Sequence, residues 1–329
     1  MATITRHGGN WQARIRRKGY PAQTRTFETK AQAMQWARAV ERKMDAGDWV
    51  DDSEAQSTTL AEALGRYERE ITPGKKGARQ ESMRIALWKR APFAERPLAK
   101  IRGTDIAEWR DARLQGGVSG QTLRNDLSLL SHVYRIARTE WGMAGLNNPV
   151  NDVRKPSAGK ARDRRLLPGE EAKLRAVASP EWDALITLAI ETGMRRGELM
   201  SLTREQIDRV KRTAYLSETK NGDTRTVPLS PAALAALDKL PARIDGRIFD
   251  PNLDDHGNRW RALCRDAGVT GLRFHDLRHE ATSRLVEAGL FNMAEIAAIT
   301  GHKTMAMLKR YYTPDVEKMA AKMASGQSR

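Results

Sequence analysis

The chain has 329 residues, with 57 lysines and arginines against 41 aspartates and glutamates, so its formal net charge is +16 at pH 7. A surplus of this size is the electrostatic footprint of a protein that binds a polyanion such as a nucleic acid, although a merely basic soluble protein also fits the charge alone. The sequence has no secretory signal and no apolar run near the roughly 18 residues of a membrane span, so we expect no membrane contact and a cytoplasmic or nucleoid location.

The sequence offers neither a disulfide nor a recognisable metal site. Cys264 is the single cysteine, which excludes a disulfide within the chain and a cysteine-rich metal centre. The six histidines are scattered and form no His-Glu-x-x-His motif, and no aspartates have the spacing of a calcium loop. We therefore expect the chemistry to need no metal and no other cofactor.

Residues 1–52 are predicted to form a small domain of three strands and one helix. Three short runs alternate apolar and polar residues, with glycine-containing turns between them, and a helical pattern with Thr29 as its N-cap follows. The sheet face is expected to carry five basic residues that would fit a groove of DNA: Arg14, Arg16, Arg17, Lys18 and Arg25. A solvated basic face fits this pattern nearly as well.

A helical domain is predicted for residues 58–150. Residues 46–57 before it change the sign of the charge and lose periodicity, which predicts a linker. Apolar residues then recur at intervals of three and four, which predicts a four-helix bundle with short connections. The turn after the first helix is basic, and its Lys75 and Lys76 are candidates for DNA contact. Residues 151–162 are basic, contain Pro, Gly and Ser, and predict a domain boundary.

Residues 162–329 are predicted to form a mixed, mainly helical domain with a small sheet. Residues 181–192 are largely apolar, so this helix must be buried. Strands are predicted near Ile207 and over 213–216 and 224–229, and the Asn-Gly pair between the last two is a strong hairpin signal that places Lys220 at the tip. The predicted fold is thus multidomain and mainly α, with small β elements in the first and last domains.

Two stretches of this last domain place polar chemistry in helical surroundings. Arg195 follows the end of the apolar helix, where a buried guanidinium needs an anionic partner, either Glu198 three residues later or a ligand. His275 and Arg278 are also three residues apart, so they share one face of a helix and can point at one anionic group. Taken alone, the first stretch fits a structural ion pair.

Three motifs together resemble the catalytic domain of the tyrosine recombinases of the phage integrase family. In chain order they are Thr-Gly-Met-Arg-Arg-Gly-Glu-Leu at 192–199, His-Asp-Leu-Arg-His at 275–279, and Gly301-His302 with Tyr311 nine residues later. Each motif is weak alone, but their order and intervals over residues 162–312 are specific. The resemblance implies that residues 58–150 are a core-binding domain and that residues 1–52 are an arm-type DNA-binding domain.

The resemblance implies a catalytic set that general chemistry supports. Arg195 and Arg278 would clamp the scissile phosphate, because hydroxyl attack places extra negative charge on its non-bridging oxygens. Tyr311 would be the nucleophile that forms a 3′-phosphotyrosine, with His275 as its base.

The remaining roles complete this set. Lys220 would protonate the leaving 5′-oxygen, and His302 would hydrogen-bond the phosphate. Glu198 would orient Arg195, whereas His279 is expected to brace the helix away from the reacting groups. Tyr312 is adjacent to Tyr311, but a one-residue step turns a side chain by about 100° on a helix, so both cannot face the phosphate.

We therefore expect a site-specific DNA recombinase that integrates or excises a phage or mobile element in a bacterial host. Its implied partners are double-stranded attachment-site DNA, three further copies in a homotetramer, and candidate accessory DNA-bending or directionality proteins. Two alternatives stay open, a type IB topoisomerase-like relaxase and a non-catalytic DNA-binding regulator. An apolar stripe over residues 315–325 fits docking on its own domain or, as the family implies, on a neighbouring protomer.

Overall fold

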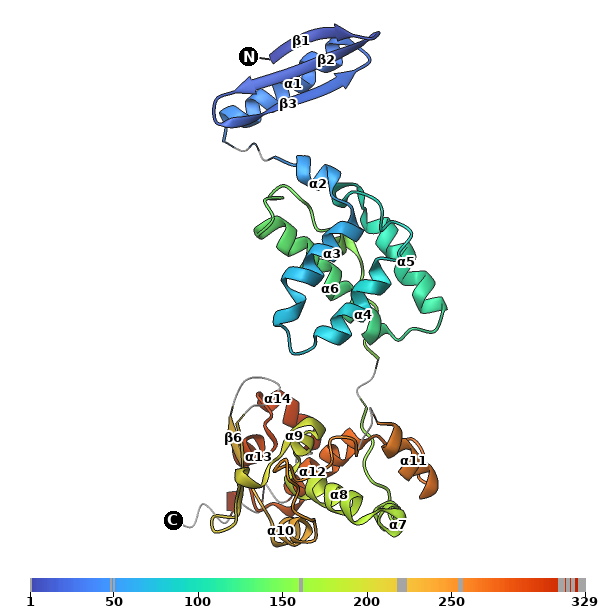
Figure 1. The fold of residues 1–329 in the computed structure, drawn as a ribbon, viewed down its shortest axis with the longest axis vertical. Coiled ribbons are helices and arrows are strands. Elements are labelled where there is room, and N and C mark those ends of the chain that lie inside the picture. Colours follow the sequence, from blue (N-terminus) through green and yellow to red (C-terminus); the bar gives the residue numbers. More distant parts are fainter. Residues whose placement is uncertain are drawn as a thin grey trace. The chain divides into compact units, whose positions relative to one another are not determined.

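The computed structural model (Figure 1) describes residues 2–47, 49, 51–159, 162–217, 224–253 and 257–312, together with 317, 320, 323 and 324. The chain divides into two compact units, residues 1–160 and 161–329, and the division falls inside the predicted connector 151–162. In the part of the chain that the structure describes, no helix is long and apolar enough to cross a membrane.

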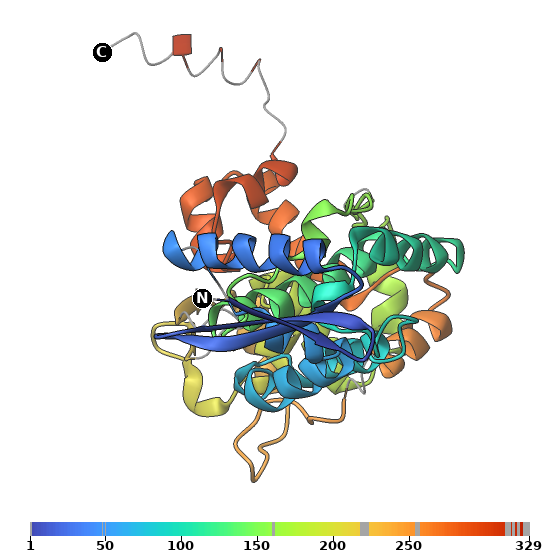
Figure 2. The same ribbon diagram turned by 90° about the horizontal axis from the view of Figure 1, so that it is seen from above.

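The first unit begins with an antiparallel sheet of order β1-β2-β3 and one helix: β1 (Ala2–His7), β2 (Asn10–Arg17), β3 (Tyr20–Phe27) and α1 (Lys30–Asp45). The predicted elements are confirmed, and Thr29 caps α1 through a reciprocal capping box with Gln32. The helix covers one face of the sheet (Figure 2), where Ile15 packs on Ala37 and Met44 in a small core.

The five basic residues predicted to share one face of this sheet do not do so. Successive side chains of a strand point to opposite faces, and Ala13 and Ile15 of β2 are buried on the side of α1. Arg14 and Arg16 therefore point to the open face. Lys18 lies in the turn that follows β2.

Arg25 and Arg17 are on the side of α1 instead. Arg25 lies directly across the ladder from Ala13, and its guanidinium stands 5.5 Å from the centre of the Phe27 ring. Arg17 forms an ion pair with Asp45 of α1. The prediction is wrong for these two because it grouped basic residues by their nearness in sequence and not by strand alternation.

A helical bundle forms the rest of the first unit: α2 (Ser53–Ser57), α3 (Leu60–Glu70), α4 (Ala78–Trp88), α5 (Gly103–Gln115) and α6 (Gly120–Thr139), with 3-10 turns at Thr72–Gly74, Leu98–Lys100 and Pro149–Asp152. Thr59 and Ser119 cap α3 and α6, and Trp88 stacks on Trp109 in the core with 4.0 Å between ring centroids. The four predicted helices are confirmed. The predicted linker is wrong in its second half, because α2 is helical and buries Ala55 in the bundle core.

The bundle core and the core beneath the β1-β2-β3 sheet are separate hydrophobic clusters. This separation supports the division of the first unit into domains 1–52 and 58–150, which stays a prediction.

The second unit is mainly helical with one small antiparallel sheet of order β4-β5-β6. Its elements are α7 (Glu170–Val177), α8 (Pro180–Thr192), α9 (Arg196–Ser201), a 3-10 turn at Arg204–Gln206, β4 (Ile207–Asp208), β5 (Thr213–Leu216), β6 (Arg225–Pro228), α10 (Pro231–Asp238), α11 (Asn258–Asp266), α12 (Phe274–Ala288), α13 (Met293–Thr300), α14 (Met305–Leu308) and a 3-10 turn, η5 (Lys309–Tyr311). The apolar helix predicted at 181–192 is α8, which is buried and packs against α10 and α12. Leu216 pairs with Arg225, so β5 and β6 form the predicted antiparallel pair.

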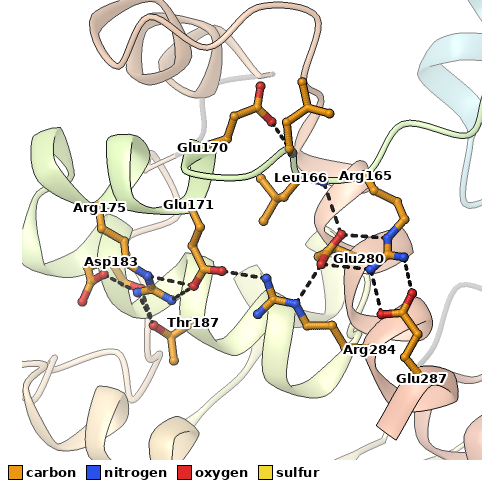
Figure 3. A network of polar contacts seen from close by, with 11 residues as sticks. Arg165, Leu166, Glu170, Glu171, Arg175, Asp183, Thr187, Glu280, Arg284 and Glu287 are labelled. Atoms are coloured by element: carbon orange, nitrogen blue, oxygen red, sulfur yellow. Dashed lines mark hydrogen bonds and ion pairs between the residues drawn. The ribbon is translucent and has the colours of Figure 1, made fainter.

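A chain of ion pairs fixes α12 to α7, α8 and the segment that precedes α7 (Figure 3). Glu280 of α12 accepts hydrogen bonds from Arg165 at 3.0 Å and from Arg284 at 2.8 Å. Glu171 of α7 joins Arg284 at 2.7 Å to Arg175 at 2.8 Å, and Arg175 continues the chain to Asp183 and Thr187 of α8. The helix that carries His275 and Arg278 is therefore held rigidly in its unit.

Candidate active site

Arg195 lies where α8 ends and α9 begins. The chain turns at Gly193, whose φ is +61°, and a Cβ there would lie 3.2 Å from Cγ2 of Thr300. Arg195 is the N-cap of α9 and donates to Glu198 twice, from its backbone N–H at 2.7 Å and from Nη1 at 2.8 Å. The structure thus brings together the predicted pair of Arg195 and Glu198.

Glu198 also binds a second arginine, Arg225 of β6, which the motifs do not include. Nη1 and Nη2 of Arg225 donate to the two carboxylate oxygens at 2.8 and 2.7 Å. Burial alone would raise the pKa of Glu198, but the hydrogen bonds from Arg225 and Arg195 outweigh burial and lower that pKa, so the carboxylate is charged. Arg225 lies two residues before the buried Val227, so the strand pattern places both side chains on one face, but it does not identify Glu198 as the partner of Arg225.

Gly301 is required where these arginines meet the end of α13. Its φ is +71°, and a Cβ at this position would lie 2.5 Å from Nη1 of Arg225. Its carbonyl oxygen accepts a hydrogen bond from Nη2 of Arg195 at 2.8 Å. The glycine of the Gly-His motif therefore helps to place both guanidinium groups.

Arg278 of α12 is a buried cation, 4% exposed. Its Nη1 donates to the carbonyl oxygen of Gly193 at 2.5 Å, and among the residues that the structure describes no carboxylate lies within ion-pair distance of it. Burial, and then the charges of Arg195 and Arg225, lower the pKa of Arg278 to about 9. His275, one turn earlier, is exposed, and loss of hydration followed by the charge of Arg278 lowers its pKa. The face of α12 that carries His275 and Arg278 therefore has positive charge without a paired carboxylate among the described residues.

His302 has a defined tautomer. The hydroxyl of Thr300 donates to the carbonyl oxygen of Ile296 at 2.6 Å and lies 2.6 Å from Nδ1 of His302. A hydroxyl has one hydrogen, so Nδ1 must carry its own hydrogen and donate to Thr300, which leaves Nε2 as a hydrogen-bond acceptor. Burial, followed by the charges of Arg278 and Arg195, lowers the pKa of His302 to about 4.

Tyr311 faces the same group of residues from η5. Its hydroxyl contacts Nδ1 of His279, and its ring lies 6.1 Å from that of His302 between centroids. Tyr312 is 45% exposed, which favours Tyr311 for the site. His279, which the sequence analysis places away from the candidate nucleophile, is thus in contact with Tyr311. Its separation of four residues from His275 places both on one helical face, and this spacing was the available signal.

Comparison with known proteins identifies the family. Residues 170–318 match the phage integrase family. A shufflon-specific DNA recombinase of Escherichia coli is 42% identical over 263 residues, which cover 77% of this chain and 68% of that protein. A putative integrase/recombinase of Haemophilus influenzae is 33% identical over 336 residues, which cover 96% of this chain and 88% of that protein. The chain is a tyrosine recombinase of the phage integrase family.

A solved lambda integrase tetramer bound to a Holliday junction resembles the recombinase in fold, with a TM-score of 0.64. The two are 22% identical, and the match covers 94% of this chain and 93% of that one. The likeness confirms the expected architecture, which is mainly helical with small sheets.

Lys220 and its turn, residues 218–223, lie outside the described residues. Lys75 is half-buried, and its ammonium donates to Glu81 at 2.8 Å and to the hydroxyl of Tyr67 at 2.6 Å; its contact with DNA stays a prediction. Lys76 is exposed in the next turn. Searched over the same described residues, no group of three His, Cys, Asp or Glu side chains could hold a metal.

Proposed function

We propose that this recombinase cleaves and rejoins DNA through a covalent 3′-phosphotyrosine at Tyr311. The observation that carries the proposal is the buried charge of Arg278, which forms no ion pair with a described carboxylate and is favoured by Glu198 only from a distance, in a site that also contains Tyr311. A cation kept out of water without an anionic partner is costly unless a ligand supplies the anion. A DNA phosphate beside a phenol is such a ligand, and the phenol is the nucleophile that it needs.

The other residues divide into phosphate contacts and supports. Arg195 would share the phosphate with Arg278. A neutral His302 with its hydrogen on Nδ1 offers only an acceptor at Nε2, so a hydrogen bond from His302 to the phosphate would require the imidazole to gain a proton when DNA binds. Glu198 balances Arg195 and Arg225 and orients both. The net effect is a preorganised cationic site whose charge is greatest where the pentacovalent transition state gains charge.

We propose Lys220 as the general acid for the leaving 5′-oxygen. It lies five residues before Arg225, and Arg225 is fixed to Glu198, so the base of this hairpin is attached to the site. An ammonium is a suitable general acid, because it can give a proton to the leaving oxygen as the bond to phosphorus breaks.

We further infer that the substrate is an attachment site on a phage or another mobile element and that four copies act together. The support comes from two similar proteins, a recombinase named for the shufflon and a lambda integrase seen as a tetramer on a Holliday junction. In this arrangement residues 58–150 would hold the core site, and Arg14 and Arg16 on the open face of the β1-β2-β3 sheet would contact arm sites.

A nicked suicide duplex cut from the DNA that flanks the gene tests the chemistry. We expect a covalent protein–DNA adduct that disappears in Tyr311→Phe and persists in the matched control Tyr312→Phe. An adduct that survives Tyr311→Phe contradicts the assignment, and absence of any adduct favours a DNA-binding regulator. Relaxation of plasmids with and without the flanking sequence at equal rates favours a type IB relaxase.

A further inference from the structure

The phenol of Tyr311 contacts one histidine of α12, and it is not the one at the start of the helix. Its oxygen contacts Nδ1 of His279, and the two rings lie 5.6 Å apart between centroids at an angle of 32°. His275 meets His279 edge to face at 5.4 Å between centroids, and no hydrogen bond joins His275 to Tyr311 among the described residues. A general base must lie within hydrogen-bond reach of the proton that it takes, so the geometry favours His279 over His275.

The pKa shifts of this pair leave both groups uncharged at rest. Burial, then the charges of Arg310 and His275, lower the pKa of His279, while Asp276 and Asp163 oppose them, so the imidazole is neutral and can accept a proton. Burial raises the pKa of Tyr311, and Arg310 and Arg278 act in the opposite direction. The resting phenol is therefore protonated and needs a base. The positive charges of Arg310 and Arg278 would stabilise the phenolate that forms.

Arg310 holds the nucleophile in this position. Its guanidinium lies 5.6 Å from the centre of the Tyr311 ring. It also donates to the backbone carbonyl of Arg162 and forms an ion pair with Asp163 at 3.6 Å. Arg162 is bound in turn to Asp276 of α12 at 2.8 Å. Tyr311 is therefore connected to α12 twice, directly through His279 and indirectly through Arg310 and Arg162.

We propose that His279 is the catalytic base that accepts the phenolic proton of Tyr311, with Arg310 as a positioning residue; this inference rests on the proposed function. During cleavage the bond from the phenolic oxygen to phosphorus forms and the bond from phosphorus to the 5′-oxygen breaks. The phenolic proton passes to Nδ1 of His279, which requires the Nε2–H tautomer. The leaving oxygen takes its proton from the general acid proposed at Lys220, and rejoining reverses each transfer.

Single-turnover cleavage of the nicked duplex tests the proposal, with the full chain carrying either tyrosine or a fluorinated tyrosine of lower phenol pKa at position 311. Loss of a general base costs about 10²- to 10⁴-fold in rate. We expect His279→Ala and His279→Gln to slow cleavage by tyrosine in this range and to shift its pH dependence to the alkaline side. The fluorinated nucleophile should restore most of the rate, because a more acidic phenol depends less on a base.

Two control variants separate the possible outcomes. Arg278→Ala should slow both nucleophiles equally, because it removes charge stabilisation and not proton transfer. His275→Ala should show no preferential rescue, and rescue of this variant in place of His279→Ala would make His275 the base. Equal slowing of both nucleophiles in the His279 variants would leave that residue a structural role and overturn the proposal, while the adduct of the unaltered chain would still uphold the proposed function. Absence of that adduct would overturn both.

Asp163→Asn tests the positioning role of Arg310. It should slow cleavage several-fold and leave the pH profile unchanged, since it loosens Tyr311 without removing the base. A shifted pH profile would contradict a role confined to positioning.

Discussion

Gly301 combines two constraints that can be measured separately. Alanine at a positive φ costs about 1–2 kcal/mol, and at this position its Cβ would also collide with Arg225. Gly289 is the matched control, because it ends α12 at a φ of +66° with nothing within 4 Å of a Cβ. We expect Gly301→Ala to lower the urea unfolding free energy by more than Gly289→Ala and to abolish cleavage. Equal losses in the two variants would show that the contact with Arg225 is unimportant.

His302 should make the second unit sensitive to acid. Its pKa is lowered from an ordinary 6.5 to about 4, so the unfolded chain binds a proton more readily than the folded one. The stabilisation is complete above pH 6.5 and is lost as the pH falls towards 4. Urea unfolding at pH 7.5 and 5 should show this loss, and His302→Gln should reduce it. An unchanged difference between the two pH values in the variant would assign the acid sensitivity to other groups.

At the scale of elements, α12 depends on the ion-pair chain of Figure 3. Glu280 is buried and accepts hydrogen bonds from Arg165, from Arg284 and from the backbone N–H of Leu166. Removing one partner of such a buried group costs about 3–5 kcal/mol. We expect Glu280→Gln to lower the unfolding free energy by an amount near that range and to slow cleavage, because α12 carries side chains that we propose to be catalytic.

The control for Glu280 is Glu287, which binds the same Arg165 from an exposed position. Exposed ion pairs contribute about 0–1 kcal/mol, so Glu287→Gln should change stability little. A loss as large as that of Glu280→Gln would mean that Arg165, and not burial, sets the energy.

The elements also show what the sequence could predict. Thr29, Thr59 and Ser119 mark helix starts through bonds to their own first turns, and such local signals can be read without a fold. The faces of Arg17 and Arg25 depend on strand register and on the packing of α1, and helix α2 depends on burying Ala55 in the bundle. No pattern in the neighbouring sequence indicates these tertiary contacts.

The site shows the same limit. The motifs identified Arg195, Glu198 and Arg278, because each lies beside other residues of its motif. Arg225 belongs to no motif, and it joins Glu198 only when β6 packs against α9 and α13. His279 was visible, but nothing local decides which of two histidines on one face meets a tyrosine from a later element.

At the scale of the whole molecule, the β1-β2-β3 domain has a core of its own, so its contribution to recombination can be tested by removing it. Removing residues 1–50 leaves α2 and the bundle in place. We expect this deletion to weaken recombination between attachment sites while the adduct with the nicked core duplex forms at its normal rate. Full recombination without these residues would contradict an arm-binding role, and loss of the adduct would place the sheet in core binding.

The unbalanced charge of Arg278 implies a trade between activity and thermal stability. Replacing a buried charge by an apolar side chain of similar size is often neutral or stabilising. Arg278→Met should therefore raise the melting temperature of the free protein while cleavage is lost. Substrate DNA should raise the melting temperature of the unaltered recombinase more than that of the variant, because only the former gains a counter-charge on binding. The enzyme would then be least stable when it has no DNA to cut, and its substrate would act as a folding ligand.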